Sequence, residues 1–167
     1  MAANIDPPVT NPYEDLSIEQ VVERFNALPR VNETDAESPN HWHFSFRCGY
    51  HVLFIFKIGS PENAYTCCDS DAALSNTSSE GAMNVTTAIL KCLLHDSDIS
   101  GARSWSLSTN NSRIADNVEA AMKKMGVDER LQHVAVSSKD LNKEARQRWE
   151  ERAEAYYRES HPEWWLY

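Results

Sequence analysis

The chain has few glycines, no long apolar run and no excess of basic residues. Only five of its 167 residues are glycine, and no two of them have the spacing of a glycine-rich phosphate loop. No stretch approaches the ~20 apolar residues of a membrane-spanning helix. The formal net charge of −9 argues against non-specific binding to nucleic acids and anionic membranes, which attract basic surfaces. We therefore predict no cofactor, and neither a nucleic acid nor a membrane as partner.

A secretory leader and paired cysteines are also missing. Residues 1–15 are polar and carry three prolines, without the basic and apolar regions of a signal peptide. We therefore predict an intracellular, cytoplasmic protein with reduced thiols rather than disulfides at Cys48, Cys67, Cys68 and Cys92. An acidic surface keeps such a protein soluble and also suits a basic partner; solubility is the simpler interpretation.

What is present indicates one globular domain. Hydrophobic residues make up 41% of the chain and charged residues 25%, as in ordinary globular proteins of this length. We predict an extended N-terminal arm at 1–15, a single domain at 16–161 and an aromatic C-terminal tail at 162–167.

The sequence of the first half of the domain predicts a helix, a β-hairpin and a second helix. Ser17 and Gln20 have the spacing of a capping box at the start of a helix that ends before Pro29. Residues 41–48 alternate between apolar and polar, and residues 52–58 are apolar on both faces except at Lys57. These runs predict two strands paired antiparallel, with a single bent strand that carries a bulge as the alternative. The segment 66–81 has the composition of a loop, and a helix follows over about 79–95.

The last third predicts a βαβα unit. A short strand at 105–108 precedes a helix that Gly126 ends, and a strand at 131–136 precedes a long helix over about 139–159. Strands joined through a helix pair in parallel. The predicted fold is α/β, with α+β as the alternative: one mixed sheet of about four or five strands with helices packed on it.

One stretch resembles a known group of proteins. It carries Ser104 to Thr109, the run from Ala115 to Gly126, Leu131 to Val134, and Ala145 to Trp149. With these residues, the segment 103–149 resembles the C-terminal α/β segment of uncharacterised fungal proteins that often carry a MYND-type zinc finger. The paired cysteines of that finger are absent here. The resemblance implies the fold of this segment and brings no activity with it.

Several residues have the chemistry of a site without its usual spacing. One short segment holds four potential metal ligands, His41, His43, Cys48 and His51, and Cys92 lies one helical turn from His95. Neither set has the paired knuckles of structural zinc sites, so we predict no metal centre. Cys67 and Cys68 have no nucleophile-elbow pattern around them. The triplets 69–71 and 96–98 each hold two aspartates, which we interpret as solvated turns.

Two hypotheses for function remain. The first is a non-catalytic module that binds another protein or self-associates through the aromatic tail, with Trp164, Trp165 and Tyr167 as anchors, or packs that tail on its own domain. The alternative is a small-molecule-binding protein or enzyme with a pocket beside the aromatic strands 41–58. Its lining would comprise Trp42, His43, Arg47, Tyr50 and His51. Whether the protein is an enzyme stays open at this point.

Overall fold

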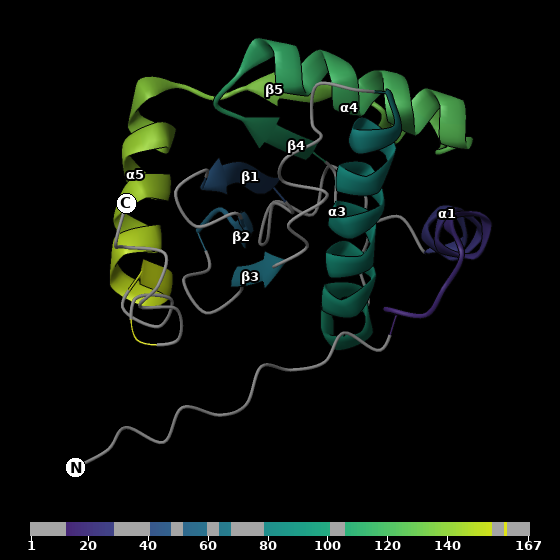
Figure 1. The fold of residues 1–167 in the computed structure, drawn as a ribbon, viewed down its shortest axis with the longest axis horizontal. Helices are drawn as coiled ribbons and strands as arrows, with labels where there is room; N and C mark the ends of the chain where they lie inside the picture. The colour runs from purple at the N-terminus through teal and green to yellow at the C-terminus, as the bar shows by residue number, and fades with distance from the viewer. Residues whose placement is uncertain are drawn as a thin grey trace.

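A computed structural model describes residues 13–28, 41–47, 52–59, 64–67, 79–100, 106–154 and 159. Within them, five strands form one mixed sheet in the order β3-β2-β1-β4-β5 (Figure 1). The strands are β1 His41–Arg47, β2 Val52–Lys57, β3 Ala64–Cys67, β4 Ser106–Thr109 and β5 Val134–Val136. β1 pairs antiparallel with β2 and parallel with β4, and β4 pairs parallel with β5. The predicted α/β fold with a mixed sheet is confirmed.

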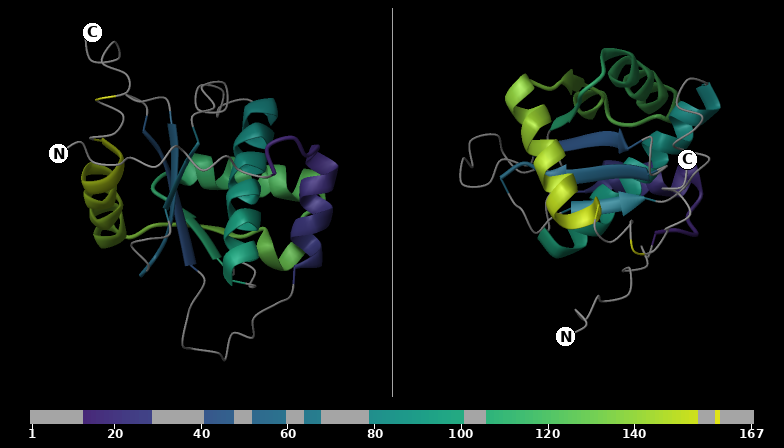
Figure 2. Two further views of the ribbon diagram at one scale, coloured as in Figure 1. Left: turned by 90° about the horizontal axis from the view of Figure 1, so that it is seen from below. Right: turned by 60° about the vertical axis from the view of Figure 1, so that its left-hand side comes forward.

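The helices cover both faces of the sheet. They are α1 Ile18–Ala27, α3 Ser79–Ser100, α4 Ser112–Met125 and α5 Lys139–Trp149, with single turns at Glu129–Leu131 (η2) and Glu150–Glu154 (η3). Figure 2 shows α5 alone on one face, α3 and α4 on the other, and α1 packed outside α3. None of the described helices combines the length and the apolar character that crossing a bilayer requires.

The main core lies between the sheet and α3, α4 and α1. Because side chains alternate along a strand, Trp42 and Phe44 of β1 point into this core together with Leu53 and Ile55 of β2. Buried residues of the helices complete it, among them Val21, Phe25, Ile89, Leu90, Val118 and Met122. A second, smaller cluster lies under α5 and comprises Phe54, Phe56, Ala145 and Trp149.

The predicted cap of α1 is confirmed in detail. The Ser17 hydroxyl accepts from the N–H of Gln20 at 3.3 Å, and the Gln20 side chain accepts from the N–H of Ser17 at 3.0 Å. These two bonds satisfy backbone donors that the helix itself leaves without partners. The pKa of the nearby Glu19 carboxyl is lowered, mostly by a hydrogen bond from a backbone N–H and to a smaller extent by a hydrogen bond from the Ser17 hydroxyl.

Gly126 ends α4, as predicted, and fixes the turn that joins α4 to α1. Its φ of 84° is left-handed, and its N–H donates to the carbonyls of Lys123 and Met122. The side chain of Asn26 in α1 donates to the Gly126 carbonyl and accepts from the N–H of Asp128, both at 2.9 Å. The turn at Gly126 therefore both ends α4 and joins it to α1 through the side chain of Asn26.

Gly126→Ala is expected to lower the free energy of unfolding by about 1–2 kcal/mol, because an L side chain is disfavoured at positive φ. No atom within 4 Å would touch the added methyl group, so the cost is conformational rather than steric. Urea denaturation measures it. Gly126→Asn is the matched control and should lose less, because asparagine tolerates this conformation. Equal losses in both variants would contradict this explanation.

The structure differs from the predicted elements at several places. β3 lies partly within the predicted loop 66–81, and it forms by antiparallel pairing with β2. α3 continues to Ser100 instead of ending near His95. Its two consecutive threonines, Thr86 and Thr87, each donate to the carbonyl four residues earlier at 2.7 Å, which satisfies their hydroxyls inside the helix. Packing also begins earlier than residue 16, since Tyr13 lies in the main core.

Candidate functional site

The described residues of the predicted aromatic-strand pocket do not meet in one place. Trp42 is buried in the main core, whereas His43, the next residue of β1, is buried on the opposite face under α5. One pocket cannot take both side chains. Arg47 ends β1, but its side chain lies outside the described residues, as do Tyr50 and His51. Trp42 and His43 lie in a strand, as predicted. The pocket that they were predicted to share is not confirmed.

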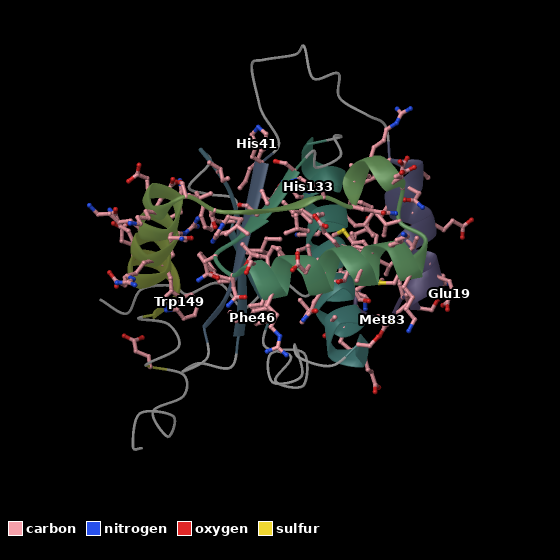
Figure 3. All side chains as sticks on the ribbon, turned by 90° about the horizontal axis from the view of Figure 1, so that it is seen from above. Glu19, His41, Phe46, Met83, His133 and Trp149 are labelled. Carbon is pink, nitrogen blue, oxygen red and sulfur yellow. The ribbon has the colours of Figure 1, made fainter. Side chains whose placement is uncertain are left out.

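His43 belongs instead to a row of histidine–serine pairs across β1 and β4. The parallel register places His41 opposite Ser106 and His43 opposite Ser108. His43 Nδ1 lies 3.1 Å from Ser108 Oγ, and His41 Nδ1 is hydrogen-bonded to Ser106 Oγ. His41 is exposed at the start of the strand, where Figure 3 labels it, and His43 is buried. β4 thus supplies a serine hydroxyl to one ring nitrogen of each of these two histidines.

α5 closes this face of the sheet. Trp149, which Figure 3 labels, packs edge-to-face on Phe54, with ring centroids 5.4 Å apart. The Arg148 guanidinium lies 5.0 Å from the centre of the Phe56 ring. His43 and Ser45 are at most 1% exposed beneath these groups. The polar face of β1 is therefore covered by packed side chains, whereas a ligand pocket beside this strand would leave that face accessible.

The other predicted candidates are scattered. Cys92 is a buried core residue that forms no disulfide, and no group of three potential metal ligands occurs among the described residues. Asp96 and Asp98 lie within α3, so the predicted turn at 96–98 is wrong. Cys67 ends β3 without a described side chain. The remaining candidates lie outside the described residues: Cys48, Cys68, the triplet 69–71, and Trp164, Trp165 and Tyr167.

Two surface hollows formed by described residues are candidates for a site. One, of about 240 Å³, lies on the outer face of α5 and is lined by Lys139, Asn142, Lys143 and Arg146. The other, of about 450 Å³, lies between α4 and the segment that leads into β5, and we name it the α4–β5 groove. Its described lining comprises Asp116, Glu119, Ala120, Lys123, Glu129, Gln132 and His133.

The α4–β5 groove adjoins the free edge of the sheet. β5 is the last strand in the order, so its far side has no neighbouring strand within the described residues. The N–H of Ser137 donates to the Thr109 carbonyl at 2.8 Å. Because backbone groups alternate along a strand, those of Val134 and Val136 point away from β4. Val136 is also 56% exposed, which makes it the most exposed large hydrophobic residue that the structure describes.

Glu119 of α4 covers one of these outward groups. Its Oε1 accepts from the N–H of Val134 at 2.6 Å and lies 2.9 Å from Nδ1 of His133, which Figure 3 labels. None of the described residues accepts from the N–H of Val136, two residues further along the same edge. Among the described residues, the N–H of Val134 at the start of this edge is therefore hydrogen-bonded, and the N–H of Val136 at its end has no acceptor.

The α5 hollow lacks such a feature. Its lining comes from successive turns of one helix and consists of three exposed cationic side chains and the half-buried Asn142. The α4–β5 groove combines a larger space, charged walls and an open backbone donor. We therefore take the α4–β5 groove, with the edge of β5, as the candidate functional site.

Sequence reasoning missed this site. It placed a strand over 131–136, and the strand is shorter because residues 129–131 form a helical turn. The sequence around Glu119 is that of an ordinary amphipathic helix, and the sequence around Val136 is that of a short apolar strand. The only available signal was the position of this strand as the last of the βαβ unit, which is where edges occur.

Comparison of the chain with protein-family models, with curated proteins and with solved structures finds no match. The resemblance of residues 103–149 to the MYND-associated segment stays a prediction. The described part of that segment forms β4, α4, η2, β5 and α5. The candidate site is therefore argued from its own geometry.

Proposed function

We propose that the protein is a non-catalytic protein-binding module that takes an extended segment of a partner at the free edge of β5. The outward N–H of Val136 carries this proposal, because it is a backbone donor at a sheet edge with no acceptor among the described residues. An added strand supplies such an acceptor from its own backbone.

The surroundings of Val136 support the same function. Its exposed side chain offers apolar contact to a strand that lies beside it. The α4–β5 groove offers room for side chains that project from the added strand, and α4 forms its far wall. Main-chain hydrogen bonds then give affinity, and the groove gives specificity.

The aromatic tail remains a second predicted binding surface. Trp164, Trp165 and Tyr167 lie outside the described residues, and their role as partner anchors, like the cytoplasmic location, stays a prediction. The edge of β5 is preferred here because its hydrogen-bonding groups are fixed by the sheet.

Val136→Pro is expected to weaken binding of an extended peptide by about ten-fold or more, because proline removes the donor that the added strand must bond. A short peptide of alternating valine and glutamine, labelled with a fluorophore, serves as the probe, and fluorescence anisotropy gives the dissociation constant. The N–H of Val136 takes no part in the pairing with β4, so the fold should tolerate proline at this edge position.

Val136→Thr is the matched control, since threonine keeps the N–H and the β-branched shape. It should bind the peptide with nearly unchanged affinity. Hydrogen exchange at the Val136 amide should also slow when the peptide binds. Binding that survives Val136→Pro in a folded protein, or an amide whose exchange is unaffected by the peptide, would refute strand addition at this edge.

A further inference from the structure

The walls of the α4–β5 groove carry more acid than base. Asp116, Glu119 and Glu129 contribute three carboxylates, against the single ammonium group of Lys123. Of these four side chains, Glu119 is half-buried and the others are exposed. Charges of one sign around a concave surface reinforce each other's potential, so the groove attracts a cation.

Glu119 is the carboxylate best placed to receive that cation. Its side chain is 35% exposed, so it can be reached from solvent, yet its Oε1 is held at the edge of β5 by the N–H of Val134 and lies 2.9 Å from Nδ1 of His133. A carboxylate accepts several hydrogen bonds at once, and Glu119 can keep the Val134 bond while it binds a further donor. Its fixed position lowers the entropic cost of forming an ion pair.

We propose that the occupant of the α4–β5 groove is an extended segment of another protein with lysine or arginine at alternate positions, one of which pairs with Glu119. The inference rests on the proposed function, because strand addition sets the direction of the side chains. In an added strand, every second side chain points to the same face of the sheet. Basic residues at alternate positions therefore share the side on which α4 and its carboxylates lie.

A second copy of this chain is a poorer occupant. The chain carries a net charge of −9, so a copy brings further negative charge to an acidic groove. Symmetric pairing of two β5 edges would also bring the two copies of Glu119 toward one another. Like charges that face each other across an interface oppose association.

Three peptides test the charge of the occupant. They share alternating valines and differ only at the intervening positions, which are all lysine, all glutamine or all glutamate. We expect the lysine peptide to bind most tightly and the glutamate peptide least. Glu119→Gln should reduce the preference for lysine over glutamine by about three- to five-fold, the size of a partly exposed ion pair. The glutamine side chain keeps an oxygen that can accept from Val134, so the edge should stay intact.

Glu150→Gln is the matched control, since it removes an exposed carboxylate at the end of α5, which packs on the opposite face of the sheet. It should leave the preference unchanged. Equal affinity for all three peptides, with loss of binding in Val136→Pro, would refute the basic occupant and leave strand addition standing. A lysine preference that survives Glu119→Gln would refute the role of Glu119.

Failure of the proposed function gives different results. If no peptide binds, or if binding is insensitive to Val136→Pro, strand addition itself is refuted and the inference falls with it. Light scattering coupled to size-exclusion chromatography tests the remaining occupant. A discrete dimer that Val136→Pro dissociates would make a second copy the occupant and overturn the proposal of a basic partner.

Discussion

Trp42→Ala is expected to lower the free energy of unfolding by about 3–5 kcal/mol, the range measured for large-to-alanine changes in buried cores. The side chain is 1% exposed and lies in the main core. Its strand, β1, is the centre of the sheet, with β2 on one side and β4 on the other. The neighbours of Trp42 are therefore held by hydrogen bonds on both sides and can collapse only partly into the space left behind.

Urea denaturation followed by far-ultraviolet circular dichroism measures this loss. Val136→Ala is a suitable comparison, because it also shortens an apolar side chain on a strand but at an exposed edge position. It should change the free energy of unfolding by less than about 0.5 kcal/mol. A loss below about 1 kcal/mol for Trp42→Ala would mean that this residue is not a buried part of the core.

The alternation of β1 shows how far the sequence predicts this structure. Period-two spacing correctly places Trp42 on one face of the strand and His43 on the other. It cannot show that both faces are buried, because a polar face is typical of a strand that meets solvent. His43 is buried with a serine partner that is 65 residues away in the chain, and no local pattern reveals such a pair.

Strand order limited the prediction of the site in the same way. The βαβ unit correctly predicts that β4 and β5 are parallel. It does not say whether β1 joins the sheet beside β4 or beside β5, and this choice decides which strand becomes the edge. β4 lies between β1 and β5, so β5 is left with outward backbone groups. The site follows from long-range pairing rather than from a motif.

β3 was missed for a related reason. Ala64–Cys67 is four residues long and borders a segment rich in serine, aspartate and asparagine, which is typical of a loop. Its strand conformation comes from pairing with residues 53–56 of β2, which are apolar on both faces. By contrast, signals that act within one turn of chain, such as the Ser17 cap and the Gly126 stop, are confirmed.

Trp149→Ala is expected to cost a comparable amount, up to about 3–5 kcal/mol, but through local release of α5 rather than loss of the whole core. The buried apolar residues that hold α5 form the small cluster of Phe54, Phe56, Ala145 and Trp149. Removing the indole eliminates its edge-to-face contact with Phe54 and leaves Ala145 as the remaining buried apolar residue that α5 contributes to the cluster.

Hydrogen exchange under native conditions separates local from global opening. In Trp149→Ala, amides of α5 should exchange much faster, while those of Phe44 and Ile55 in the main core should remain protected. Arg146→Ala is the control, since it changes an exposed residue of the same helix and should leave α5 protected. Equal loss of protection in α5 and in the main core would show that the two clusters unfold together. Peptide binding at the α4–β5 groove should persist in Trp149→Ala, because α4 packs on the opposite face of the sheet from α5.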